Sequence, residues 1–188
     1  MGHSLALTLP EIILTVSALA LLMVAAYSGD KSSKLVNWLA IAAFAVAAFF
    51  VPGVFDAGAV GFDGLFIADS FAAFSKILIY IAAAAALVAA GGWFARDGLY
   101  RAEYPVLVLL SGVGMGMMVS AGDLLTLYVG LELQSLAAYV LASFQRKDTR
   151  SAEAGLKYFV LGALASGILL YGISLLYGFT GSTLFGDI

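Results

Sequence analysis

The stretch that decides the fold is LLTLYVGLELQSLAAYVLASF, residues 124–144. Its 21 residues contain one charged side chain, Glu132. A helix that crosses the hydrocarbon core of a bilayer needs about 20 mostly apolar residues. Lipid cannot satisfy exposed backbone groups, so an apolar run of this length has to be helical. The stretch therefore predicts a transmembrane helix.

Five further apolar runs of similar length surround this one. They cover residues 5–27, 35–55, 71–94, 105–121 and 154–179. Pro10 and Pro105 stand near the start of two runs, where the missing N–H costs nothing. The longest connection, residues 56–70, is acidic and contains glycine, which predicts a short surface turn or an interfacial segment. We therefore expect an all-α integral membrane protein with about six transmembrane helices, in a single domain over residues 1–188.

The composition of the chain also indicates a membrane protein. Of its 188 residues, 63% are hydrophobic and 11% are charged, whereas soluble domains have about 25% charged residues. The chain has no cysteine, and its one histidine, His3, lies near the chain start. Because haem, iron–sulfur and zinc sites use Cys or His ligands, we expect no redox centre or transition metal on this chain. We expect the bilayer, and not nucleic acid, as its surroundings.

The basic residues are distributed unevenly between the two sides of the predicted bundle. Seven of the nine lie in the first, third and fifth loops: Lys31, Lys34, Arg96, Arg101, Arg146, Lys147 and Arg150. The second and fourth loops have none. Because positively charged loops stay in the cytoplasm, this split predicts a periplasmic N-terminus. A signal peptide is disfavoured in place of the first helix, since MGHS contains no Lys or Arg.

Glu132 is the most informative charged residue, because it lies in the middle of an apolar run. At helical spacing, Tyr128, Glu132, Ser135 and Tyr139 share one face, while Gln134 points toward another neighbour. We expect this polar stripe to face other helices or a water-filled path. A carboxyl group at this depth is typical of a proton relay. A neutral glutamate that is hydrogen-bonded between helices is the other interpretation, and both stay open.

Four other charged residues lie in or at the start of apolar runs. Glu153 and Lys157 stand at i and i+4 in the favourable order for a local ion pair, although Lys157 also lies deep enough for a proton path. The long stem of Lys76 predicts that its ammonium group snorkels to the outer interface. Glu11 follows Pro10 in a first helical turn, where a carboxylate suits the helix dipole.

Small residues recur at a spacing of four in two of the runs. Gly112, Gly116 and Ser120 form one such series, and Gly162 and Ser166 form another. Small residues at this spacing let membrane helices approach closely, so we expect both helices to make close interior or subunit contacts.

Several segments resemble one known family. They include GFDGLFIADSFAAFSK at the entry to the third helix, GLEL around Glu132, and EAGLKYF followed by LGALAS in the sixth helix. Together they resemble subunit N of the bacterial NADH–quinone oxidoreductase, an antiporter-like subunit of respiratory complex I. The resemblance covers essentially the whole chain. It implies a bundle of fourteen membrane helices, built around two inverted five-helix repeats, of which this chain is the first part.

The same resemblance implies roles for two residues. Glu132 matches the glutamate of the fifth helix, which in the family pairs with a lysine on the seventh helix. Lys157 matches a lysine of the sixth helix and is a possible part of a proton path. Because the sequence stops after six helices, we expect a fragment that ends before the proton-translocating repeat is complete.

The function implied by the resemblance is proton translocation coupled to electron transfer from NADH to quinone in the bacterial inner membrane. The implied partners are the other membrane-arm and peripheral-arm subunits. No cofactor is expected on this chain, because NADH, flavin, iron–sulfur clusters and quinone belong to other subunits. Two alternatives remain: a cation/proton antiporter subunit without a respiratory link, and a purely structural membrane-arm subunit.

Overall fold

The structure, a computed structural model, describes residues 2–51, 58–97 and 101–188. Within these ranges the chain is almost entirely helical. The helices are α1 Gly2–Leu7, α2 Leu9–Ser28, α3 Ser33–Phe50, α4 Ser70–Asp97, α5 Glu103–Val119, α6 Leu124–Ala142 and α7 Thr149–Thr180. Two short strands, β1 Ala59–Gly61 and β2 Phe66–Ala68, form a hairpin between α3 and α4.

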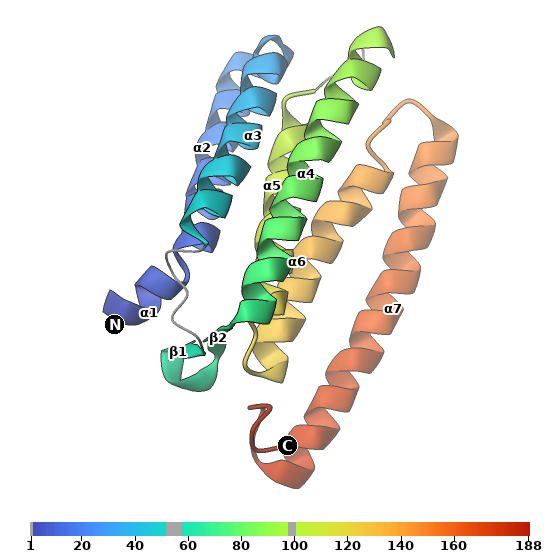
Figure 1. The fold of residues 1–188 in the computed structure, drawn as a ribbon. Coiled ribbons are helices and arrows are strands. Elements are labelled where there is room, and N and C mark those ends of the chain that lie inside the picture. Colours follow the sequence, from blue (N-terminus) through green and yellow to red (C-terminus); the bar gives the residue numbers. More distant parts are fainter. Residues whose placement is uncertain (1, 52–57, 98–100) are drawn as a thin grey trace.

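The long helices lie side by side and alternate in direction (Figure 1). Helix α5 is central, since it packs against α2, α4 and α6, and α7 packs on α6 at one side of the bundle. The turns between α2 and α3 and between α6 and α7, the end of α4 and the start of α5 all lie at one end, which we call the basic end (Figure 1). The hairpin and the link between α5 and α6 lie at the opposite end, which we call the hairpin end.

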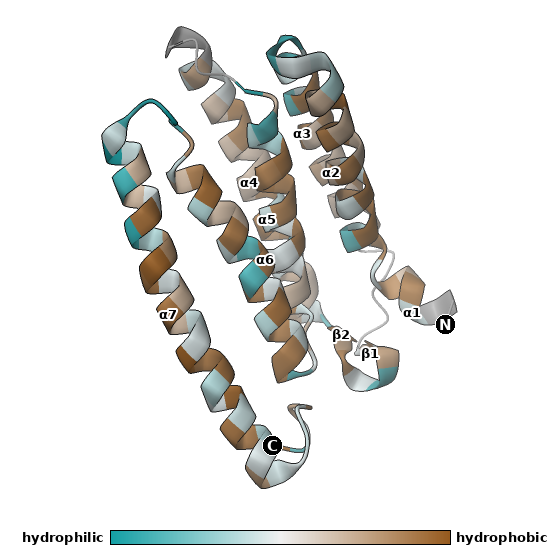
Figure 2. Cartoon of the chain, turned by 180° about the vertical axis from the view of Figure 1, so that it is seen from behind, coloured by the Kyte–Doolittle hydropathy of each residue, from teal (hydrophilic) through white to brown (hydrophobic). Residues whose placement is uncertain are grey.

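The expected all-α membrane architecture is confirmed. Among the described residues, four stretches are long and apolar enough to cross a membrane, namely 9–50, 70–94, 124–142 and 149–180. The first comprises both α2 and α3, which are joined by a tight 3₁₀ turn over Gly29–Ser32. Helix α5 is shorter, with 17 residues and a length of about 25 Å. Figure 2 shows apolar residues along all these helices, and hydrophilic residues gathered in turns at the basic end.

Predicted helix boundaries differ from the structure at several places; for example, the sixth predicted helix, residues 154–179, begins at Thr149 as α7. The first predicted helix, residues 5–27, is divided at Thr8 into the short α1 and the long α2, and Pro10 stands in the first turn of α2. The second predicted helix, residues 35–55, corresponds to α3, which ends at Phe50. Residues 52–55 of that prediction lie outside the described part of the chain.

Glycines of α5 create the close helix contacts that the sequence predicted. A Cβ atom built on Gly112 would lie 2.6 Å from Cε1 of Phe44 on α3. A Cβ atom on Gly114 would lie 2.6 Å from the backbone of Gly130 and of Gln134 on α6. Both distances are shorter than real side chains allow, so the absence of a side chain sets the spacing of α5 from its neighbours.

The hairpin occupies the connection that was expected to be a surface turn. Val60 pairs with Ile67 in its antiparallel register. The Ile67 N–H donates to the carbonyl of Ser120 at 2.8 Å, and the Gly122 N–H donates to the carbonyl of Leu65 at 2.9 Å. These bonds satisfy the irregular backbone between α5 and α6, and they dock the hairpin against that link.

Candidate functional site

Helix α6 carries the central candidate residue, and its start is held firmly. The carboxylate of Asp123, 1% exposed, accepts hydrogen bonds from the N–H groups of Leu125 at 3.1 Å and Thr126 at 3.0 Å. It also accepts a bond from the Thr183 hydroxyl at 3.2 Å. An aspartate before an apolar helix is a common N-cap. This one also ties the segment after α7 to the start of α6.

Glu132 lies on the side of α6 that faces α7, and it meets a serine there. The Ser166 hydroxyl donates a short hydrogen bond to Oε1 of Glu132. The Tyr128 hydroxyl lies 2.9 Å from the same serine oxygen. Because a serine hydroxyl has one proton to donate, Tyr128 donates to Ser166 while Ser166 donates to Glu132. The three side chains therefore form a directed hydrogen-bond chain that ends on the carboxyl group.

The rest of the predicted stripe also lies along α7 or turns inward. Tyr139 makes an edge contact with the ring of Tyr158, with ring centroids 4.8 Å apart, and its hydroxyl lies against Gly162. Ser135 instead bonds to the side chain of Gln134 at 3.4 Å. The backbone of Gln134 packs on Gly114 of α5, as expected for a residue on another face. Tyr128, Glu132 and Tyr139 therefore face another helix, as predicted, whereas no hydrogen bond of Ser135 with α7 is present among the described residues.

Lys157 lies in a different environment from Glu132. Its Nζ atom is 2.5 Å from Oε1 of Glu153, and these side chains are 70% and 58% exposed. The predicted local ion pair is therefore present. Within the ranges that the structure describes, no ion pair includes Glu132. Ser166 is the partner that the sequence analysis noted only as a small residue.

The prediction that Lys76 snorkels to the interface is wrong. Its Nζ atom lies 2.7 Å from Oε1 of Glu11, and the two side chains are 3% and 7% exposed. The ammonium group also lies 4.7 Å from the ring centroid of Phe66 on β2. Glu11 does stand in the first turn of α2, as expected, but it faces inward to this pair. The pairing joins residues far apart in the chain, so no local spacing indicates it.

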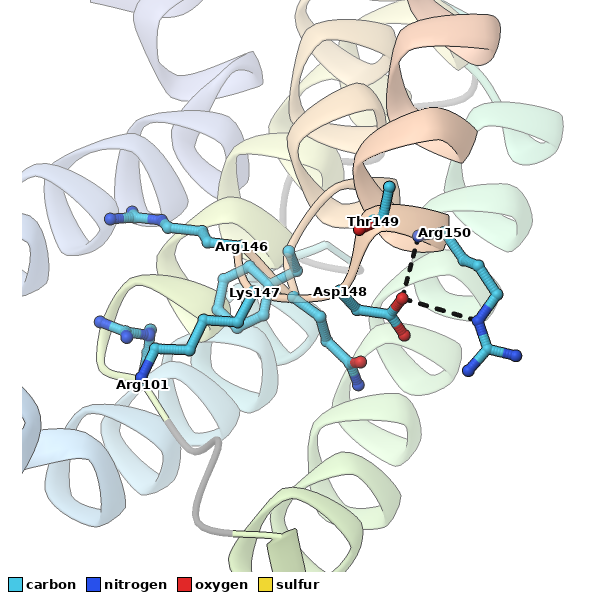
Figure 3. A pocket seen from close by; sticks show the side chains of 8 residues that line it. Arg101, Arg146, Lys147, Asp148, Thr149 and Arg150 are labelled. Carbon is cyan, nitrogen blue, oxygen red and sulfur yellow. Dashed lines mark hydrogen bonds and ion pairs between the residues drawn. The ribbon is translucent and has the colours of Figure 1, made fainter.

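Basic side chains from two turns meet at the basic end. Arg101, Arg146, Lys147 and Arg150 line one pocket there, together with Asp148 (Figure 3). Asp148 caps α7, since its carboxylate accepts from the N–H of Arg150 at 2.9 Å. The third and fifth predicted loops therefore lie at the same end of the bundle, as the distribution of basic residues predicted. The side chain of Arg96, also used in that prediction, lies outside the described residues.

Three comparisons relate the chain to known proteins. Residues 121–188 match the family model described as NADH:quinone oxidoreductase/Mrp antiporter, TM. The chain is 72% identical over its whole length to NADH-quinone oxidoreductase subunit N of Rhizorhabdus wittichii. It is 62% identical, over 97% of its length, to the same subunit of Erythrobacter litoralis. It spans 39% of the length of each of these two relatives.

Solved structures share the fold. The chain superposes on a chain of respiratory complex I from Thermus thermophilus, solved with bound aureothin, with a TM-score of 0.77 and 29% identity. The match covers 94% of this chain and 38% of that one. A chain of the Mrp complex from a Dietzia species gives a TM-score of 0.68 at 17% identity, covering 98% of this chain and 20% of that one. The arrangement of helices is therefore shared beyond closely similar sequences.

Proposed function

The chain belongs to the family of NADH-quinone oxidoreductase subunit N, and from this we propose that it acts within a proton-translocating membrane-arm subunit of respiratory complex I. The role is to carry protons while other subunits transfer electrons from NADH to quinone. As the family resemblance implies, we assign flavin, iron–sulfur clusters and the NADH and quinone sites to those subunits; the lack of cysteine in this chain agrees with this for the iron–sulfur clusters, whose usual ligand is cysteine.

The observation that carries this proposal is the hydrogen-bond chain from Tyr128 through Ser166 to Glu132. A carboxyl group within an apolar transmembrane helix is expensive, and such groups usually mark ion or proton pathways. Hydroxyl groups can both donate and accept a proton. The chain of Tyr128 and Ser166 therefore leads to a group that can bind and release one.

We further propose that Glu132 exchanges its proton under the influence of a nearby cation, as the family resemblance implies. Two unit charges 4 Å apart interact by about 4 kcal/mol at an effective dielectric constant of about 20. The free energy of ionising the carboxyl group therefore changes by about 4 kcal/mol when the cation moves into or out of contact with it. That change is large enough to decide whether Glu132 holds a proton. Lys157 remains a candidate for the path, since it lies on the same helix as Ser166.

The same proposal sets the orientation and partners. We place the basic end in the cytoplasm and the hairpin end in the periplasm of the bacterial inner membrane, because basic loops remain cytoplasmic. We expect contacts with other membrane-arm and peripheral-arm subunits of the complex.

The decisive experiment is Glu132→Gln in the native membrane complex. Glutamine keeps the size and a hydrogen-bonding oxygen but cannot bind and release a proton. We expect normal assembly with a marked loss of NADH-driven proton pumping. Glu103→Gln is the matched control, since Glu103 forms an exposed ion pair with Arg146 at the basic end. Pumping at the wild-type rate in Glu132→Gln would instead support a purely structural role.

A cation/proton antiporter subunit is the second candidate, favoured by the family model that joins both groups of proteins. Purification of the native complex separates the two functions. Peripheral NADH-oxidising subunits should copurify if the respiratory proposal is correct, and they should be absent from an independent antiporter.

A further inference from the structure

A second charged cluster lies on the side of α5 away from α6. It is built on the buried ion pair between Glu11 of α2 and Lys76 of α4. The hydroxyl of Tyr80, one turn beyond Lys76 on α4, lies beside the Glu11 carboxylate, since both reach the same face of Gly116. Gly116 of α5 leaves room for both groups, since a Cβ atom there would lie 2.9 Å from Glu11 Oε1 and 3.1 Å from the Tyr80 hydroxyl. Four elements, α2, α4, α5 and β2, therefore enclose one ionisable pair.

The described residues around the pair do not satisfy all of its hydrogen-bonding atoms. Glu11 Oε2 and the hydroxyl oxygens of Tyr80 and Ser120 are buried without a protein hydrogen-bond partner among them. Ser120 stands one turn after Gly116 at the end of α5, on the same side. Buried polar atoms normally have a partner, which is often ordered water. A carboxylate with an unused oxygen has the capacity to bind one more proton.

The cluster and Glu132 lie at similar depth in the bundle. Gly114 touches Gly130 and Gln134, the residues two before and two after Glu132. Gly116, which touches Glu11, is two residues farther along α5, an axial step of about 3 Å. Neighbouring helix axes are about 8–10 Å apart, so with α5 and part of α6 between them the two carboxyl groups are roughly 15 Å apart.

This distance permits a measurable interaction. At roughly 15 Å and an effective dielectric constant of about 20, one unit charge changes the occupancy of a proton site by roughly sixfold. Salt does not screen charges inside the bundle as it does in solvent. The protonation of Glu132 and that of the cluster are therefore coupled, and the coupling acts equally in both directions.

We propose that Glu11 and Lys76 form a second proton-binding site, whose affinity for a proton is roughly sixfold higher when Glu132 is ionised than when Glu132 is protonated. On filling, a proton from solvent at the hairpin end bonds to a Glu11 carboxylate oxygen. Lys76 keeps its own proton, so the net charge of the pair rises from zero to plus one. On emptying, that O–H bond breaks, the proton returns to solvent, and the carboxylate pairs again with Lys76. This inference rests on the proposed proton-carrying role of Glu132.

The test uses the native complex in membrane vesicles with Glu11→Gln, Lys76→Met and the double variant. A single change leaves one buried charge without its partner and can prevent assembly, whereas removal of both charges avoids that penalty. The double variant is therefore the decisive one. We expect it to assemble at the wild-type level but to pump protons several-fold more slowly. Infrared difference spectra with isotope-labelled glutamate should lose one protonated-carboxyl signal in Glu11→Gln and in the double variant.

Two controls separate the possible failures. Glu103→Gln should leave both pumping and the carboxyl signals unchanged. If Glu132→Gln is impaired while the Glu11/Lys76 double variant assembles and pumps normally, the second site is wrong and the proposed function stands. If the double variant fails to assemble, the pair links helices and does not exchange protons, which also overturns the inference. If Glu132→Gln pumps normally, the proposed function itself fails.

Discussion

Replacing Gly114 with alanine tests whether the contact between α5 and α6 positions Glu132. The added Cβ atom would lie 2.6 Å from the Gln134 backbone nitrogen and 2.6 Å from the Gly130 carbonyl oxygen. Ordinary contact begins at 3.4 Å, so the shortfall is 0.8 Å. Both obstructing atoms belong to backbone and cannot rotate away. The two helices must therefore separate, and α6 must move with Glu132.

The expected cost follows from two opposing terms. Overpacking a well-packed contact typically costs about 1–3 kcal/mol. We expect the upper part of this range, because the clash is with backbone on both sides. Alanine also favours the helix over glycine by about 1 kcal/mol. The net destabilisation of Gly114→Ala should therefore be about 2 kcal/mol.

Gly172→Ala is the matched control, because a Cβ atom on Gly172 of α7 would meet nothing within 4 Å. Gly172→Ala gains the helix preference of alanine without the clash, so the two variants should differ in stability by about 3 kcal/mol. The measurement is the unfolding midpoint of the purified full-length protein in bicelles, followed by helical circular dichroism. Equal midpoints for the two alanine variants would refute the argument that this contact is close-packed.

Three further changes have defined outcomes. Asp123→Ala removes the cap of α6 and the bond to Thr183, which should cost about 0.5–2 kcal/mol and accelerate amide exchange in the first turn of α6; unchanged exchange would contradict this. Ser166→Ala removes the hydroxyl that links Tyr128 to Glu132, and it should slow proton pumping about tenfold, a barrier increase of about 1.4 kcal/mol, if the hydroxyl chain feeds Glu132. Lys157→Met breaks an exposed pair worth about 0.3–0.5 kcal/mol, so a large loss of pumping with normal thermal stability would assign Lys157 to the proton path.

Most of the fold could be predicted from the sequence because lipid leaves few options for a long apolar run. The six predicted helices correspond to α2 through α7, and three of the four residues in the polar stripe, Tyr128, Glu132 and Tyr139, face a neighbouring helix as the periodicity indicated. The hairpin was missed because each strand has three residues, too few for a recognisable alternation. Its stability depends on bonds to residues 120 and 122, which are distant in the chain.

The candidate site was less predictable, because its contacts join different helices. Lys76 has a long stem that suits an interface, and only the folded structure places Glu11 beside it. In the sequence, Ser166 fits a pattern of small residues, and its hydroxyl meets Glu132 only because α7 packs against α6. In contrast, the pair of Glu153 and Lys157 lies within one helix, and its spacing alone was sufficient.

The attachment of α7 to α6 has a mechanical consequence. Near the hairpin end, the Leu124 N–H donates to the Thr183 carbonyl at 2.9 Å. Midway along the helices, the Ser166 hydroxyl donates to the Glu132 carboxyl group. Near the basic end, the Ser151 hydroxyl donates to the Ala142 carbonyl at 3.0 Å. Hydrogen bonds at these three levels along the bundle hold α6 and α7 together as one rigid unit. A sideways push on α7 is therefore transmitted to α6, and the acidic group travels with its hydroxyl partner instead of being pulled away from it.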